Sequence, residues 1–187
     1  PGATGYPVPG YECKVVDPDS GEEVPRGEPG LLAVRGPTGI SYWDRPRKQA
    51  EAMVDGWSLP GDIYIHREDG RLEYKSREDD LIISSGYNIP GPEVEAVVEE
   101  RAEVSEVAVI GAPDEERGQI VKAFVVPADD ATAGDELTET IQTHVKNTLA
   151  PYKYPRAVEY VDELPRTETG KIQRVKLRER EREQYEE

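Results

Sequence analysis

Short apolar segments separated by turn residues occupy the chain up to about Ser76. Within these segments apolar and polar residues alternate, and this period of two predicts β-strands with one buried face. The EDG sequence at 68–70, between the last two segments, is typical of a hairpin turn. A separate stretch, 45–53, predicts a short helix with Asp44 as its cap and Pro46 in its first turn. The predicted strands are 11–17, 30–35, 62–66 and 71–75.

From Asp80 onward the pattern changes, and helical periods appear between the strand-like segments. Pro92 opens a predicted helix in which Val94, Val97 and Val98 share one face. The acidic residues of this helix are expected to face solvent, and they are Glu93, Glu95, Glu99 and Glu100.

A second helix is predicted from apolar residues that recur every four positions, with Asp135 as its cap. Those apolar residues are Leu137, Ile141, Val145 and Leu149. Three strands at 104–110, 119–126 and 157–161 and a charged final helix at 175–183 complete the pattern. The sequence therefore predicts an α+β domain of about 110 residues, an ordinary size, with a three-stranded sheet and covering helices.

Charge limits the possible partners. Among 187 residues, Asp and Glu number 39 against 23 Lys and Arg, which gives a formal net charge of -16. This charge disfavours non-specific binding to nucleic acid and to anionic membranes. The acidic residues are spread along the whole chain and lysine is scarce relative to arginine, which indicates a surface adapted to high salt.

Few residues could bind a metal or form a disulfide. Cys13 is the single cysteine in the sequence, and His66 and His144 lie in unrelated contexts, so neither a disulfide nor a metal site is predicted. No apolar run approaches the roughly 20 residues of a membrane span, and no segment resembles a signal peptide. These observations predict a cytoplasmic protein.

Two longer motifs resemble a known family. Residues 77–95 read REDDLIISSGYNIPGPEVE, and residues 164–174 read LPRTETGKIQR. The first is similar to the junction between the large and small domains of AMP-forming acyl-CoA synthetases, in the adenylate-forming superfamily. The second is similar to the catalytic-lysine loop of the same enzymes.

The resemblance implies that residues 1–78 are the mostly β, C-terminal portion of a large adenylating domain. Residues 79–187 would then be the small C-terminal lid domain. No segment of the chain resembles the Ser/Thr/Gly-rich loop with which the family grips ATP phosphates. We therefore expect the chain to be the C-terminal fragment of a longer enzyme, inactive alone, whose partner is the upstream remainder of its own large domain.

Adenylation brings two anions together, so a flexible cation must reach the transition state. The resemblance implies that Lys171 is this catalytic, ATP-contacting residue. Thr167 and Thr169 would keep its loop polar, and Gly170 would loosen it. The alternative is that Lys171 is an ordinary solvated loop lysine.

Three further residues are matched to nucleotide binding and to domain movement. The resemblance implies that Asp62 binds the ribose hydroxyls of ATP, although Pro60 stands where the family has threonine. It assigns a nucleotide contact to Arg77 and the hinge of domain rotation to Asp79. The alternatives are a turn aspartate, a structural salt bridge and a strand cap, respectively.

The CoA-binding residues are likewise implied by resemblance. The turn formed by Ser85, Gly86 and Tyr87 would line the pantetheine path, where a side chain on the glycine would narrow the tunnel. Asn88 stands where similar enzymes often have arginine, so it is given no charge-based role. Contacts to the CoA nucleotide are predicted for Arg117, Tyr154, Pro155 and Arg156, with Lys146 as a weaker candidate.

The resemblance as a whole implies an ATP-dependent, AMP-forming acid:CoA ligase that uses ATP, Mg²⁺, CoA and a medium-chain fatty or aromatic acid. One alternative is an adenylation unit that loads a carrier protein. Another is a free-standing binding module without chemistry of its own.

Overall fold

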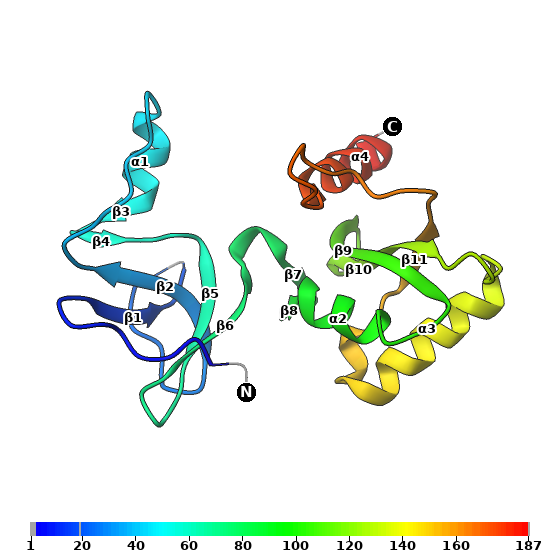
Figure 1. Ribbon diagram of the computed structural model, residues 1–187, viewed down its shortest axis with the longest axis horizontal. Helices are drawn as coiled ribbons and strands as arrows, with labels where there is room; N and C mark the ends of the chain where they lie inside the picture. Colours follow the sequence, from blue (N-terminus) through cyan, green and yellow to red (C-terminus); the bar gives the residue numbers. More distant parts are fainter. Residues whose placement is uncertain (1–2, 19, 187) are drawn as a thin grey trace. The chain divides into compact units, whose positions relative to one another are not determined.

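The computed structural model describes residues 3–18 and 20–186, and the chain divides into two compact units between Asp79 and Asp80 (Figure 1). The first unit is a sheet with one helix, and the second is a three-stranded sheet covered by helices. Within the described residues, no helix combines the length and the apolarity that crossing a membrane requires.

Six strands form the sheet of the first unit. Their order is β3-β4-β2-β5-β6, with β1 paired to β2, and each pairing is antiparallel. All four predicted strands are present, and the predicted turn joins β5 to β6 with Gly70 at a φ of +82°. The strands are β1 (Glu12–Val16), β2 (Pro29–Arg35), β3 (Met53–Val54), β4 (Trp57–Ser58), β5 (Asp62–His66) and β6 (Leu72–Arg77).

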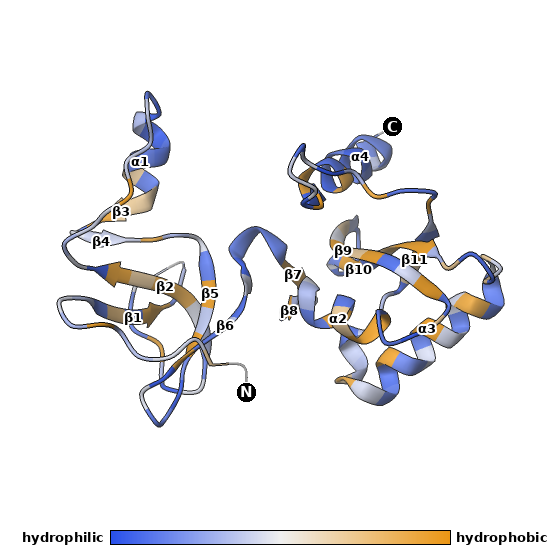
Figure 2. Ribbon diagram, in the orientation of Figure 1, coloured by the Kyte–Doolittle hydropathy of each residue, from blue (hydrophilic) through white to orange (hydrophobic). Residues whose placement is uncertain are grey.

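Alternation along β1 and β2 buries apolar side chains on both faces of this sheet, and Figure 2 shows apolar residues along both strands. Val15 packs with Leu32 on one face, whereas Val16 packs with Leu31 and Ile63 on the other. Each fully buried side chain of this size contributes roughly 1.5–3 kcal/mol. The sheet therefore has a small core on each side.

The α-helix α1 (Pro46–Ala52) of the first unit corrects one prediction. Asp44 is not its cap: Arg45 is the N-cap residue, and no side-chain hydrogen bond caps the helix. Asp44 instead adopts a positive φ of 52° one position earlier, in the turn that leads to the helix. Pro46 at the first position needs no partner for a backbone N–H, since proline has none.

In the second unit, the predicted three-stranded sheet with covering helices is confirmed. Its order is β11-β10-β9, in which β9 and β10 are antiparallel and β10 and β11 are parallel. The strands β9 and β10 extend beyond their predicted ends and form a long hairpin. The elements are η1 (Glu78–Asp80), β7 (Leu81–Ser84), β8 (Tyr87–Pro90), α2 (Gly91–Val98), β9 (Val104–Asp114), β10 (Gly118–Pro127), α3 (Asp135–Thr148), η2 (Pro151–Lys153), β11 (Ala157–Tyr160) and α4 (Arg174–Glu186).

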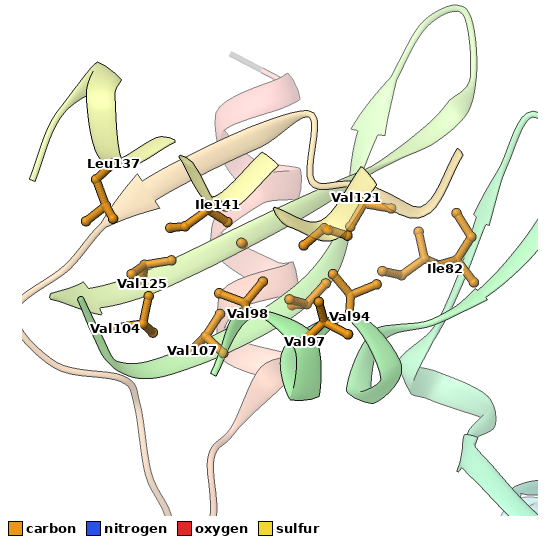
Figure 3. Packing of buried hydrophobic residues seen from close by; sticks show 14 residues of the cluster. Ile82, Val94, Val97, Val98, Val104, Val107, Val121, Val125, Leu137 and Ile141 are labelled. Carbon is orange, nitrogen blue, oxygen red and sulfur yellow. The ribbon is translucent and has the colours of Figure 1, made fainter. Parts of the chain in front are cut away.

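Two apolar clusters sandwich this sheet. On one side α2 and α3 contribute Val94, Val98 and Ile141 to a core with Val109 and Val121 of the sheet, as Figure 3 shows for the labelled side chains. The other cluster joins the sheet residues Ala108, Ile110 and Phe124 to Leu164 and to Leu177 of α4. The segment that contains Lys171 is thus flanked by two buried leucines.

Two predictions about the helices are wrong. Asp135 is not a cap but the first helical residue of α3, because Gly134 occupies the N-cap position with a φ of 156°. Glu95 does not face solvent, since only 7% of it is exposed. It lies one turn from Gly91 and one turn from Val98, both buried, and a Cβ on Gly91 would approach the Val109 carbonyl oxygen to 2.9 Å. The helix therefore lies against the sheet at this point, and Glu95 is buried there.

Candidate functional site

Asp62 and Arg77 are brought together in the first unit. Asp62 begins β5 and Arg77 ends β6, and the two are paired across the hairpin. Arg77 Nη1 donates 2.9 Å hydrogen bonds to Asp62 Oδ1 and to the carbonyl oxygen of Pro60. Gly61 has a φ of +77°, and a Cβ at that position would lie 3.1 Å from Arg77 Nη2. The Pro60-Gly61 turn thus holds the guanidinium beside the carboxylate.

This pair remains open to solvent. The Arg77 side chain is 46% exposed and that of Asp62 is 25% exposed. Partial burial alone would lower the pKa of Arg77, but the charge and hydrogen bond of Asp62, together with the charge of Asp79, raise it. The cation is therefore permanent, and both groups have hydrogen-bonding capacity left for a polar ligand.

A hollow of about 610 Å³ in the first unit is lined by Arg77 and Asp79, together with Leu31, Tyr42 and Gly61. Its lining combines apolar and aromatic side chains with charged groups, which suits a planar polar ligand. Asp79 lies in η1, and the division between the two units falls directly after it. Its hinge role stays a prediction.

Lys171 lies in a closed turn of the second unit. Thr167 N–H donates to the Lys171 carbonyl at 2.8 Å, and Lys171 N–H donates to Thr167 Oγ1 at 3.1 Å. Arg166 Nη1 donates to the Gly170 carbonyl at 2.7 Å. Gly170 has a φ of +84°, so the turn requires glycine for its backbone conformation. These hydrogen bonds close the loop, and that Gly170 loosens it stays a prediction.

The side chain of Lys171 is exposed, and among residues 3–18 and 20–186 it has no ion-pair partner. By contrast, Arg166 in the same turn pairs with Glu106 at 2.6 Å. A rigid backbone thus presents a lysine on a long mobile stem to solvent. This arrangement can deliver a point charge to an anion.

Ser85 and Gly86 form the two-residue turn between β7 and β8. Their φ values are 50° and 80°, as in a type I′ hairpin. Arg117 secures the turn, since its carbonyl accepts from Ser85 N–H at 2.9 Å and its Nη1 donates to Ser85 Oγ at 3.0 Å. A Cβ on Gly86 would meet nothing within 4 Å, so here too the backbone is what requires glycine.

Tyr87 follows this turn and stacks on Tyr152. The ring centroids are 4.2 Å apart and the planes differ by 18°, and both side chains remain largely exposed. Lys153 next to Tyr152 donates to both Glu93 oxygens, at 2.8 and 2.7 Å, and so fixes η2 to α2. The turn at 85–87, Arg117 and η2 therefore share one surface.

Tyr154 and Arg156 form a second group after η2. Arg156 Nη1 donates to Tyr154 Oη at 2.9 Å, and Lys146 Nζ lies 4.0 Å from the centre of the Tyr154 ring. Pro155 between them is buried, and Arg156 N–H bonds to the Val121 carbonyl at 2.8 Å. Arg156 and Tyr154 thus lie on a segment that is fixed to β10, and Lys146 of α3 adds a second cation beside the Tyr154 ring.

The structure also shows site-adjacent residues that the sequence analysis did not single out. Tyr152 stacks on a predicted CoA residue, and the buried Glu95 bonds to Arg174. Glu95 and Arg174 are the last residues of the two matched motifs, so the motifs already contained the signal. The structure brings together Asp62 with Arg77, Ser85 with Arg117, and Tyr154 with Arg156.

Comparison with known proteins assigns the family. The sequence pattern of the AMP-binding enzyme C-terminal domain matches residues 93–171, and that of the AMP-binding enzyme matches residues 1–43. Both units are therefore matched by the same family. The chain belongs to the AMP-binding enzyme family.

Relatives that the chain matches are acid:CoA ligases by name. The chain is 42% identical over 178 residues to benzoate–CoA ligase of Thauera aromatica, and the match covers 95% of the chain and 34% of the relative. It is 44% identical over 189 residues to the mitochondrial acyl-coenzyme A synthetase ACSM2A of Homo sapiens, covering 97% and 33%. The chain thus spans about a third of the length of these relatives.

Solved structures of similar proteins agree. The anthranilate CoA ligase AuaEII in complex with anthranoyl-AMP matches with a TM-score of 0.83 and 40% identity, over 97% of the chain and 35% of that protein. ATP-bound MatB from Rhodopseudomonas palustris matches with a TM-score of 0.81 and 36% identity, over 96% and 36%. Mixed α+β architecture is thus shared with adenylate-forming enzymes.

Proposed function

We propose that this chain is the C-terminal part of an ATP-dependent, AMP-forming acid:CoA ligase. Residues 1–78 would complete a large adenylating domain, and residues 79–187 would be its lid. The observation that carries the proposal is Lys171, an exposed lysine on a hydrogen-bonded turn inside a family-matched segment, with no ion-pair partner among the residues that the structure describes. The names of the relatives support the reaction class.

In the first step, a carboxylate oxygen of the acid attacks the α-phosphorus of ATP, and pyrophosphate leaves. Negative charge accumulates on the phosphoryl oxygens while two anions approach. We assign Lys171 to this charge, because its ammonium can be placed there at little reorganisation cost once the backbone turn is fixed. Its stem provides the reach, and its rigid turn provides the direction.

Asp62 and Arg77 are proposed to hold the nucleotide. Two carboxylate oxygens can accept from two ribose hydroxyls, and the second acceptor site of Asp62 is not used by Arg77. Arg77 adds donors at the edge of the same hollow. Their mutual hydrogen bond keeps each in place before the ligand binds.

In the second step, the CoA thiol attacks the acyl carbon of the adenylate and AMP leaves. We propose that rotation at Asp79 brings the surface of Ser85, Gly86 and Tyr87 to the thiol arm. Arginines on the second unit would bind the CoA phosphates, which accept charge-assisted hydrogen bonds. The residues proposed for the nucleotide of CoA are Arg117, Tyr154, Pro155 and Arg156.

Mg²⁺ is proposed to accompany ATP, where it supplies charge neutralisation of the phosphates when bound. Within residues 3–18 and 20–186, no three His, Cys, Asp or Glu side chains form a group that could hold a metal ion. We therefore assign the metal no ligand from the described residues and no step of its own.

The acid is proposed to be a medium-chain fatty acid or an aromatic acid, in keeping with the names of the relatives. We propose a reducing, cytoplasmic setting from the single Cys13, and a high-salt setting from the net charge of -16. Activity that rises with salt concentration would support the second of these proposals.

The test is single-turnover kinetics of the complete enzyme, with adenylation and thioester formation measured separately. Lys171→Ala should lower adenylation by about 100- to 1,000-fold, the loss typical for removal of one preorganised charge-stabilising group. Thioester formation from supplied acyl-adenylate should remain. Lys176→Ala, which removes an exposed lysine of α4, is the matched control and should leave both steps unchanged. Equal rates for Lys171→Ala and wild type would refute the assignment.

The alternative of a carrier-loading unit predicts a different result at the CoA residues. In the ligase, replacing Arg117 and Arg156 with alanine should raise KM for CoA with little change in adenylation. An unchanged KM for CoA would instead favour transfer to a carrier protein. A complete protein that forms no acyl-adenylate would favour the binding-module alternative.

A further inference from the structure

Arg174, the first residue of α4, follows the Lys171 turn directly and makes a two-pronged ion pair. Its Nε donates to Glu95 Oε1 at 2.8 Å, and its Nη2 donates to Glu95 Oε2 at 2.6 Å. The Arg174 side chain is 22% exposed and that of Glu95 only 9%. Such fork-to-fork geometry fixes both the distance and the orientation of the two groups.

Glu95 is in turn fixed to the sheet. Its Oε1 also accepts the backbone N–H of Val109, in the middle of β9, at 2.8 Å. A carboxylate with these three donors has little freedom to turn, and burial makes any loss of a partner costly. Through Glu95, Arg174 is therefore fixed to the middle of β9, an edge strand of the sheet.

Asp80 extends the same network to the start of the second unit. Arg178, one turn along α4, donates to Asp80 Oδ1 at 3.1 Å, and Arg174 Nη1 lies 3.8 Å from Asp80 Oδ2. Asp80 directly follows the predicted hinge residue Asp79. The beginning of α4 is thus fixed to Asp80, the first residue of the second unit, as well as to the sheet.

The turn that carries Lys171 is closed on itself, so its ends determine where it points. The carbonyl of Pro165 accepts the N–H of Gln173 at 2.7 Å, which brings the two ends of the turn together. Leu164 is buried on the sheet before the turn, and Arg174 is anchored after it. Because both ends of the turn are fixed and its interior is hydrogen-bonded, the backbone of Lys171 has one orientation relative to the rest of the second unit.

We propose that Arg174 is a positioning residue for adenylation: with Glu95 it forms a buried clamp that aims the Lys171 turn. The inference rests on the proposed catalytic function of Lys171. It is distinct from a purely stabilising role, because a clamp that aims Lys171 affects the step that uses Lys171 and spares the step that does not. A displacement of about 1 Å at a reacting group can cost about 100-fold in rate.

The test compares both half-reactions in the complete enzyme for Arg174→Gln, Arg174→Lys and Glu95→Gln, with thermal unfolding measured on each. Arg174→Gln should lower adenylation by about 100-fold, with thioester formation from supplied acyl-adenylate changed by less than about twofold. Arg174→Lys keeps the charge but loses the two-pronged hydrogen bonding of the guanidinium. Its adenylation rate should therefore lie between those of Arg174→Gln and wild type. Glu95→Gln tests the clamp from its other side if an Arg174 variant fails to fold.

Lys122→Met is the matched control. Lys122 of β10 forms a similarly buried pair with Glu181 at 2.7 Å, and Glu181 lies on α4 seven residues after Arg174. This variant should lower the unfolding temperature comparably and leave the ratio of the two half-reactions unchanged. Equal losses in both half-reactions for Arg174→Gln, or an altered ratio for Lys122→Met, would overturn the positioning role.

Failure of this inference can be told from failure of the proposed function. If Lys171→Ala retains full adenylation, the catalytic assignment itself is wrong. If Lys171→Ala loses adenylation and Arg174→Gln keeps the wild-type ratio, only the clamp is refuted. The clamp further predicts that Arg174→Gln adds almost nothing to the loss in Lys171→Ala, since the two changes remove one interaction.

Discussion

Each unit of the chain contains an arginine–carboxylate pair next to a family motif, and the two pairs differ in burial. Asp62 and Arg77 share one 2.9 Å hydrogen bond, Arg77 lines a hollow, and 46% of the arginine side chain is exposed. Glu95 and Arg174 share two hydrogen bonds, and the carboxylate of Glu95 also accepts a hydrogen bond from a backbone N–H. The same chemical groups thus form an open pair and a closed pair.

The difference shows what burial does to an ion pair. An exposed pair contributes about 0–1 kcal/mol to stability and can exchange a partner for a ligand. A buried pair contributes little net stability compared with apolar packing, but removal of one partner leaves a desolvated charge. Asp62 and Arg77 are therefore available to bind a ligand, whereas Glu95 and Arg174 hold parts of the second unit in a fixed position.

The largest expected effect is on the closed pair. Glu95→Ala should destabilise the second unit by roughly 3–5 kcal/mol, because Arg174 and the Val109 N–H lose their acceptor. Urea unfolding, followed by a probe in the second unit, measures this loss. Exchange of both partners for apolar residues of similar shape should restore much of it, and a loss below about 1 kcal/mol for Glu95→Ala would contradict the closed character of the pair.

A smaller effect on stability, and a clear effect on binding, is expected at the open pair. Arg77→Ala should change stability by less than about 1 kcal/mol. In the complete enzyme it should weaken ATP binding by about 10-fold or more, the value of one hydrogen bond to a charged group. The measurement is the equilibrium affinity for ATP of Arg77→Ala, with Arg71→Ala on the same hairpin as the control. Unchanged ATP affinity would leave Arg77 as a structural residue.

The smallest effect is expected at a pair of intermediate exposure. Burial alone would raise the pKa of Glu159, but the hydrogen bond and charge of Lys122 and the charge of Arg180 lower it. A lowered folded-state pKa means that Glu159 contributes stability above its unfolded pKa and loses it as the pH falls through the folded value. Glu159→Gln should therefore destabilise the second unit slightly at neutral pH and flatten the acid limb of its stability profile. An unchanged acid limb would show that other carboxylates determine the loss of stability at low pH.

Elements defined by local pattern were predictable from the sequence. The hairpin around residues 68–70 and the three-stranded sheet follow from alternation and turn residues, and both are present. The caps at Asp44 and Asp135 were wrong because the neighbouring Arg45 and Gly134 hold the cap positions, a choice that depends on local backbone angles.

Residues that depend on distant partners were not predictable in this way. Helical periodicity places Glu95 at the edge of the apolar face, where it can be either solvated or buried. Its burial is decided by Arg174, which lies 79 residues further along the chain. The stack of Tyr87 on Tyr152 depends in the same way on how η2 packs. The motifs contain Tyr87, Glu95 and Arg174, but only the fold shows which residues these three contact.

The distance in sequence between Glu95 and Arg174 has a practical consequence for building hybrid enzymes. A graft that replaces only the lysine loop and α4 would import a new arginine without the carboxylate that fitted it. The same graft would separate Asp80 from Arg178. A junction between Asp79 and Asp80 keeps all four residues on one exchanged piece, so we expect second units of related proteins to be interchangeable at that junction.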